Sequence, residues 1–204
     1  MASGLRLRAP GVAWQALAAL LAAGSLAAWW APTARWDWQP ALAASQPWRC
    51  WSAAFVHWSA QHLLANLLGT AVLAALGRAA ELPARAALAW FLAWPLTQLG
   101  LLAQPALAHY GGLSGVLHAG VAVAAVELLL GARGRPRRIG AAIATGLLLK
   151  ITLEQPWGPP LRHPADWDIA IAPLAHATGA AAGALLAVAA ATALPRRGPR
   201  QSGR

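Results

Sequence analysis

The stretch GLSGVLHAGVAVAAVELLL, residues 112–130, decides the fold class of this chain. It contains one charged residue, Glu127, and it approaches the roughly 20 apolar residues that an α-helix needs to cross the hydrocarbon core of a bilayer. Further apolar runs of this kind lie before and after it along the chain. The predicted spans are residues 12–31, 53–76, 85–103, 112–130, 138–153 and 169–194. The sequence therefore predicts an all-α membrane protein, with one domain of six transmembrane helices over residues 1–194.

The composition supports this reading and excludes a water-soluble globule. Hydrophobic residues make up 58% of the chain and charged residues only 11%, whereas soluble domains average about 25% charged residues. The net charge of +10 could suggest a nucleic-acid partner, but the basic residues lie between the apolar runs, so no nucleic-acid partner is expected. The single cysteine excludes an internal disulfide framework.

The positions of the arginines predict the orientation of the spans. With a cytoplasmic N-terminus, most arginines fall on the cytoplasmic side, and only Arg35, Arg49 and Arg162 fall on the other. Because cytoplasmic loops of membrane proteins are enriched in Lys and Arg, both termini are predicted to be cytoplasmic. Residues 195–204 (PRRGPRQSGR) are polar and basic, and we expect them to form a disordered cytoplasmic tail.

Polar side chains gather early in the second, fourth and sixth predicted spans. Because these three spans run from outside to inside, their polar residues should share one layer in the outer half of the bilayer. Polar groups in hydrocarbon are costly and mark function or packing. The set consists of His57, His62, Asn66, Ser114, His118 and His176.

Helical spacing places some of these residues on common faces. His62 and Asn66 are one turn apart, as are Ser114 and His118. Taken alone, each has an ordinary interpretation, since a serine in a span usually bonds to its own helix and a histidine usually packs.

Glycines predict which helices approach each other. Gly179 and Gly183 share the face of His176 on the sixth span, and glycines at such spacing let another helix come close. The natural neighbour is the fourth span, where Gly112 and Gly115 flank the serine. Ser114 and His176 are then expected within hydrogen-bond reach, which an activated serine requires.

Other chemistries for cutting a peptide bond in a membrane lack their residues. The sequence has no HExxH motif for a zinc protease, and no predicted span contains the aspartates of an aspartyl protease. Asp37, Asp166, Asp168 and His109 are expected to be exposed in outer loops. Ser114 and His176 should therefore act as a dyad without a carboxylate, and neither a metal nor a cofactor is expected. A histidine-based metal or haem protein stays open as an alternative.

Three motifs in the same order resemble those of rhomboid intramembrane serine proteases. WRCWSAAFVHWSAQHLLAN (residues 48–66) is similar to their first loop and second helix, GGLSG (residues 111–115) to their nucleophile motif, and HATGAAAG (residues 176–183) to their sixth helix. GLSGVLHAG (residues 112–120) resembles more closely the signature of the rhombosortase branch. In that signature Gly is usual at the position of Ala119.

The resemblance implies a role for each residue of the motifs. Ser114 and His176 would be catalytic, and His62 and Asn66 would form the oxyanion hole. The supporting residues would be His57, His118, Gly112, Gly115, Gly179 and Gly183.

The resemblance also implies a substrate class and a location. Such proteins of the bacterial inner membrane are expected to cut C-terminal sorting tails of the GlyGly-CTERM type on the periplasmic side. The new C-terminus would then pass to a lipid-linked amine. The alternatives are a rhomboid protease of other transmembrane substrates and an inactive rhomboid-like protein that binds helices.

Overall fold

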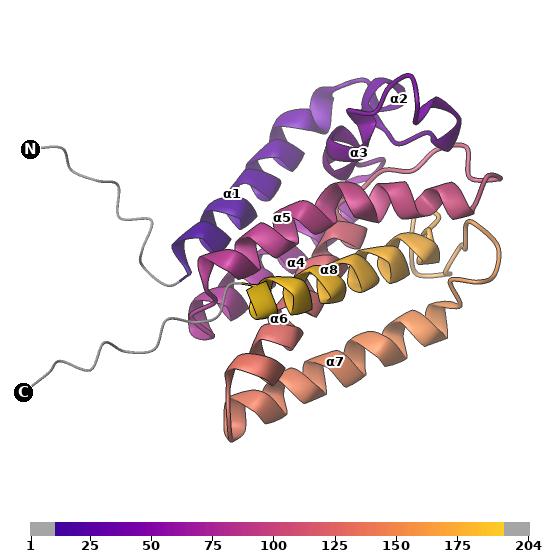
Figure 1. Cartoon of the computed structure of the whole chain (residues 1–204). Helices are drawn as coiled ribbons and strands as arrows, with labels where there is room; N and C mark the ends of the chain where they lie inside the picture. Colours follow the sequence, from indigo (N-terminus) through magenta and orange to yellow (C-terminus); the bar gives the residue numbers. More distant parts are fainter. Residues whose placement is uncertain (1–10, 194–204) are drawn as a thin grey trace, which may run out of the picture.

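A computed structural model describes residues 11–193, which form a bundle of helices (Figure 1). Within this range the β-structure amounts to two isolated bridges, Trp38 with Tyr110 and Arg162 with Ile171. Short helices α2 (Thr33–Trp36) and α3 (Arg49–Ser52) lie in the long connection after the first helix. The long helices are α1 (Val12–Ala27), α4 (Ala60–Ala79), α5 (Ala84–Leu99), α6 (Ser114–Gly131), α7 (Arg135–Glu154) and α8 (Pro173–Ala193).

Five helical segments have the length and apolar composition needed to cross a membrane. They are Val12–Trp30, Ala60–Ala79, Ala84–Ala103, Ser114–Gly131 and Pro173–Ala193. The helix α7 is not among them, because three arginines at its start and Lys150 and Glu154 at its end interrupt its apolar run. The all-helical class is confirmed, while a membrane crossing by residues 138–153 stays a prediction. The predicted tail, residues 195–204, lies outside the described residues.

Two of the predicted spans begin later than expected, for local reasons. Ser59 caps α4, since its Oγ accepts the backbone N–H of His62 at 3.0 Å. The residues before it form a short 3-10 turn and a loop, so His57 precedes the helix and does not lie within it. The helix α8 begins at Pro173, a residue suited to a first helical position, and Ile171 before it pairs with Arg162.

The polar ends of α4 and α8 lie at the same end of the bundle. The helix α7 ends and α8 begins there, whereas α1 begins and α8 ends at the opposite end (Figure 1). The start of α4 is tied to the connection between α7 and α8, because Ser59 Oγ donates to Asp168 Oδ1 at 2.8 Å and Gln61 Nε2 donates to the Asp166 carbonyl at 3.1 Å.

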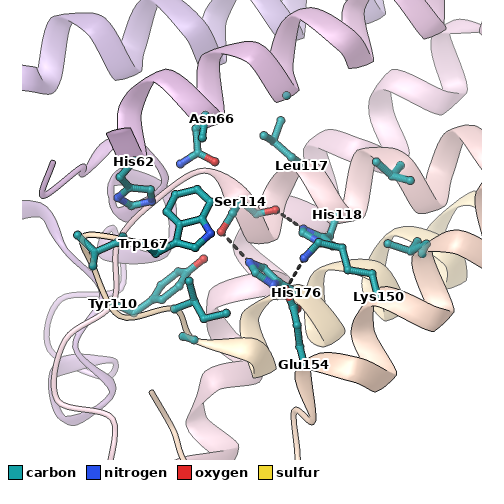
Figure 2. Close-up of a pocket in the computed structure, with 18 of the residues that line it drawn as sticks. His62, Asn66, Tyr110, Ser114, Leu117, His118, Lys150, Glu154, Trp167 and His176 are labelled. Carbon is teal, nitrogen blue, oxygen red and sulfur yellow. Dashed lines mark hydrogen bonds and ion pairs between the residues drawn. The ribbon is translucent and has the colours of Figure 1, made fainter. Parts of the chain in front are cut away.

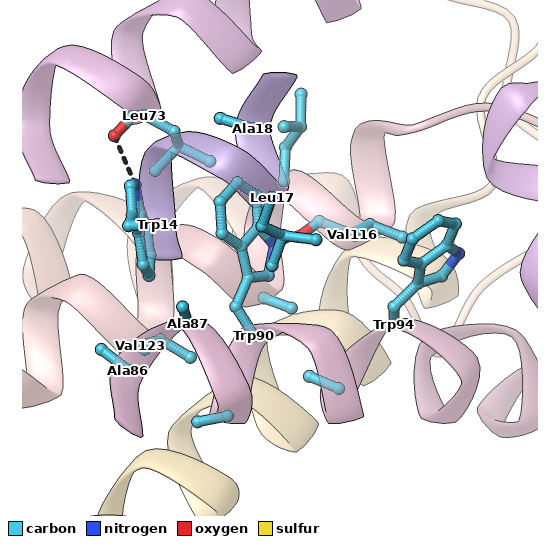
Figure 3. Close-up of a cluster of buried hydrophobic side chains, with 14 of the residues drawn as sticks. Trp14, Leu17, Ala18, Leu73, Ala86, Ala87, Trp90, Trp94, Val116 and Val123 are labelled. Carbon is cyan, nitrogen blue, oxygen red and sulfur yellow. Dashed lines mark hydrogen bonds between the residues drawn. The ribbon is translucent and has the colours of Figure 1, made fainter. Parts of the chain in front are cut away.

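Two buried tryptophans join α1, α4, α5 and α6. The rings of Trp14 and Trp90 lie 4.4 Å apart, and both side chains are fully buried (Figure 3). Each indole N–H donates at 2.8 Å to a helix carbonyl, Trp14 to Leu73 and Trp90 to Val116. The polar edge of each ring is thereby satisfied away from water.

Glycines bring α8 into backbone contact with α6. A Cβ added at Gly179 would lie 2.1 Å from the carbonyl oxygen of Gly115, and one added at Gly183 would lie 2.3 Å from that of Ala119. Any side chain here would push the helices apart. This packing sets the start of α8 beside the start of α6.

The helix α7 packs closely on α6 near its start but not in its middle. Near its start, a Cβ on Gly140 would meet Leu128 Cβ at 2.7 Å, so α7 touches α6 there. Further along, a Cβ on Gly146 would meet nothing within 4 Å. Gly140 is the only buried residue of α7. The middle of α7, around Gly146, therefore borders open space.

Residues of the connection between α1 and α4 are anchored by a buried carboxylate. Asp37 is 1% exposed, and its Oδ1 and Oδ2 bind Arg49 Nη1 at 3.0 Å and His109 Nδ1 at 2.6 Å. The expectation that Asp37 would be exposed is therefore wrong, because it pairs with Arg49. His109 keeps a partly exposed ring but is bound to this carboxylate.

Candidate active site

A cavity of about 870 Å³ lies between α4, α6, α7 and the segment before α8. Its floor and walls are largely apolar, with Gly69 and Val72 from α4, Val121 from α6 and Ile143 from α7. Polar groups converge at one end. They are His62, Asn66, Tyr110, Ser114, His118, Lys150, Glu154 and His176 (Figure 2). A mostly apolar cavity with a few convergent polar groups is typical of a binding or active site.

Ser114 is the first residue of α6, and the backbone before it needs glycine. Gly112 has φ +118°, a conformation that residues with a side chain rarely adopt. A Cβ there would also lie 2.5 Å from His62 Nε2. Gly112 thus lets the chain enter α6 directly against the His62 ring.

His176 on α8 links Ser114 to a carboxylate. Its Nε2 lies 2.9 Å from Ser114 Oγ and its Nδ1 lies 2.6 Å from Glu154 Oε2 (Figure 2). An ionised carboxylate only accepts hydrogen bonds, so Nδ1 carries the proton. Nε2 is then the unprotonated nitrogen and can accept the serine hydroxyl proton.

The expectation of a site without a carboxylate is wrong, because Glu154 bonds to His176. Glu154 is the last residue of α7 and is also bound to Lys150 Nζ, one turn earlier. The predicted topology is consistent with this position of Glu154, because the fifth predicted span ends on the side of the membrane where the sixth begins. A carboxylate directly after residue 153 therefore reaches the depth of a histidine early in the sixth span.

His118 packs on His176, as its spacing from Ser114 allows. The two imidazole rings are stacked, with centroids 4.1 Å apart and planes 11° apart. His118 Nδ1 lies 2.7 Å from the Ser114 carbonyl oxygen, one turn back on α6. This bond holds the His118 ring, and the stack limits rotation of the His176 ring.

Asn66 and His57 form a buried pair on the other side of the cavity. Asn66 Nδ2 donates to His57 Nε2 at 3.0 Å, and His57 Nδ1 donates to the Phe55 carbonyl at 3.1 Å. Burial lowers the pKa of His57 to about 4, so its ring is neutral at physiological pH. His57 thus acts as an acceptor that orients the Asn66 amide.

His62 lies between this pair and the backbone before Ser114. Its ring centroid is 4.7 Å from that of His57, and Trp58 stacks nearby at 6.3 Å. Its Nδ1 is buried and has no hydrogen-bond partner among residues 11–193. With Asn66, it presents polar atoms at the polar end of the cavity.

Tyr110 is a buried polar residue that the sequence analysis did not single out. Its side chain is 5% exposed, and its hydroxyl donates to the Gly112 carbonyl at 3.5 Å. Burial raises the pKa of Tyr110 to about 12, so the phenol stays protonated and remains a donor. Its bridge to Trp38 continues into the anchored connection before α4.

The comparisons with known proteins place the chain in a family. The family model for the rhomboid domain matches residues 44–192, which hold all the residues of the cavity. A search of curated proteins found no match to the chain. Rhomboid proteins are intramembrane serine proteases, and the matched region runs from the connection before α4 nearly to the end of α8. On that match over most of its length, the chain belongs to the rhomboid family.

Proposed function

We propose that this protein is a serine endopeptidase that cleaves transmembrane substrates, with Ser114 as nucleophile and His176 as general base. The observation that carries the proposal is the 2.9 Å contact between Ser114 Oγ and His176 Nε2 at the polar end of a large apolar cavity. Both groups have the geometry that nucleophilic catalysis requires.

The reaction begins when Ser114 Oγ attacks a substrate carbonyl carbon and His176 Nε2 takes the hydroxyl proton. The carbonyl oxygen becomes an oxyanion, for which His62, Asn66 and the Ser114 backbone N–H are the proposed donors. Such donors are worth about 2.7–4 kcal/mol each in other enzymes. The Ser114 N–H is also at the start of α6, where the helix dipole favours negative charge.

The intermediate then collapses, and the bond from carbon to the leaving nitrogen breaks. His176 Nε2–H gives its proton to the leaving amine, which leaves an acyl group on Ser114. Water or an amine attacks this acyl-enzyme while His176 Nε2 takes its proton. The bond from the acyl carbon to Ser114 Oγ then breaks, and His176 returns the proton to Oγ. Hydrolysis gives a free carboxylate, whereas an amine gives a new amide.

The finer assignment is a rhombosortase that removes C-terminal sorting tails of the GlyGly-CTERM type and transfers the product to a lipid-linked amine. The resemblance of GLSGVLHAG to the rhombosortase signature supports it. The protein would lie in the bacterial inner membrane with its site toward the periplasm. Arg78 near the end of α4, Arg85 near the start of α5 and the arginines at the start of α7 support this orientation, because these helix ends lie opposite the site.

Labelling by a fluorophosphonate probe, combined with cleavage of a reporter, tests the proposal. The reporter ends in a Gly-Gly motif, an apolar helix and an arginine cluster, and a second reporter carries an unrelated transmembrane helix. Ser114→Ala and His176→Ala should abolish both labelling and cleavage while the protein still accumulates in the membrane. Ser45→Ala and His163→Ala, at exposed positions, are the matched controls and should behave as wild type.

Each outcome distinguishes one part of the proposal. Cleavage by Ser114→Ala would overturn the nucleophile. Equal cleavage of both reporters would support protease activity but contradict specificity for the sorting tail. No cleavage or labelling by the wild type would favour an inactive helix-binding protein. Mass spectrometry of the new C-terminus separates a carboxylate from an amide.

A further inference from the structure

We propose that Glu154 is a positioning residue of the catalytic site, so that the protein works with a Ser114–His176–Glu154 triad. This inference rests on the proposed function and adds a residue on α7 to it. Glu154 would hold the proton on His176 Nδ1, fix the plane of the ring and stabilise the imidazolium that forms during the attack.

The two oxygens of the Glu154 carboxylate have separate partners. Oε2 accepts from His176 Nδ1 at 2.6 Å, while Oε1 accepts from Lys150 Nζ. The side chain of His176 is 7% exposed and that of Glu154 is 17% exposed. The bond is therefore largely shielded from water. A charge-assisted hydrogen bond is stronger in such a shielded position than in water.

The backbone of Glu154 is held in place at the end of α7. Arg162 Nη1 donates to the Glu154 carbonyl at 2.8 Å, which satisfies a carbonyl that the helix leaves free. The next residue, Gln155, has φ +53° and ends the helix. With His118 stacked on its face, the His176 ring is restrained both at Nδ1 and across its plane.

A metal site made of the same residues is the main alternative. His118, Glu154 and His176 each have a ligand atom within 4.8 Å of the others. However, the Nδ1 atoms of both histidines are already engaged, with Ser114 O and with Glu154. Lys150 also places a positive charge beside the carboxylate. These contacts favour the hydrogen-bonded triad over a cation.

The proton transfer in the triad involves Ser114 and His176 alone and leaves the protonation state of Glu154 unchanged. The Ser114 Oγ proton moves to His176 Nε2 as the bond from Oγ to the carbonyl carbon forms. The imidazolium then has two N–H groups, and the Nδ1–H stays on the ring and donates to Glu154 Oε2. Glu154 remains ionised, which is how the carboxylate acts in other serine hydrolases.

Steady-state kinetics of Glu154→Gln in liposomes test the proposal. The glutamine has the shape of the native residue but no charge, and its amide can donate to Nδ1 and favour the wrong tautomer. We expect kcat to fall about 10²–10⁴-fold, the range for acid–base catalysis, with KM nearly unchanged. Glu154→Asp keeps the carboxylate and should recover part of kcat. Glu81→Gln is the matched control, since Glu81 is exposed in the turn after α4.

A spectroscopic readout separates positioning from a structural role. The wild type should show a strongly downfield proton resonance for His176 Nδ1–H, and both Glu154→Gln and His176→Ala should lose it. Unchanged kcat in Glu154→Gln, with Ser114→Ala inactive, would overturn the triad and leave the proposed protease intact. Activity in Ser114→Ala would instead overturn the protease itself. Loss of wild-type activity with a chelator, restored by Zn²⁺, would assign the cluster to a metal.

Discussion

At the scale of single residues, the site depends on buried groups that are each held by a second one. His176 is bound to Glu154, and Asn66 is bound to His57. Glu154 fixes which nitrogen of His176 faces the cavity, and His57 fixes the orientation of the Asn66 amide. A histidine or an amide can present a donor or an acceptor, so these partners decide the chemistry as well as the position.

The stability of the protein should depend on pH through His57. Its pKa is about 4 in the folded protein against 6.5 for an unperturbed histidine. Between these values the unfolded chain binds more protons, so stability should fall as pH drops from about 6.5 to 4 and then level off. Thermal unfolding in detergent measures this, with His57→Gln as the test variant.

In His57→Gln the decline between these pH values should be shallower, because the group that titrates is absent. His163→Gln is the control, since that residue is exposed. An unchanged slope in His57→Gln would show that another group causes the acid sensitivity.

At the scale of helices, the close packing of α8 on α6 brings Ser114 and His176 together. Gly179→Ala places a methyl group 2.1 Å from the Gly115 carbonyl oxygen, and neither backbone can move cheaply. Overpacking of this kind costs about 1–3 kcal/mol. We expect a lower unfolding temperature and a large loss of fluorophosphonate labelling, because Ser114 and His176 move apart.

The matched control is Gly146→Ala on α7, where the new methyl group meets nothing within 4 Å. Replacing a helical glycine by alanine there should be neutral or stabilise by up to about 1 kcal/mol. If both variants behave alike, the contact between α6 and α8 does not control the site.

Much of the helical arrangement could be predicted from residue patterns, and the exceptions have physical causes. Apolar runs indicated the long helices, and the glycines near His176 pointed to α6 as its neighbour. Glu154 is not predicted because it lies one residue beyond the fifth apolar run, and only the fold shows that the end of α7 lies against the start of α8. Hydropathy places His57 within a span, because it does not reveal the local hydrogen bond by which Ser59 caps α4.

At the scale of the whole molecule, the orientation in the membrane can be tested with single cysteines. The native Cys50 is buried, and burial raises the pKa of its thiol, so it should react slowly. Trp157 is 73% exposed at the end with the site, and Arg137 is exposed at the opposite end. Both positions can carry a reporter cysteine.

A membrane-impermeant maleimide should label Trp157→Cys in cells whose outer membrane alone has been opened. Arg137→Cys should be labelled only after the inner membrane is permeabilised. The parent protein with Cys50 alone gives the background. The reverse labelling pattern would place the site in the cytoplasm and contradict the arginine distribution.

The second half of α7 both borders the cavity and carries the carboxylate that bonds to His176. Glu154 sits on the same helix that borders the cavity across from α4. A displacement of the end of α7 away from α8 would break the 2.6 Å bond between Glu154 Oε2 and His176 Nδ1. In the proposed triad, the position of α7 would therefore set both the width of the cavity and the alignment of the His176 ring, so one helix would couple access to the site with its readiness to react.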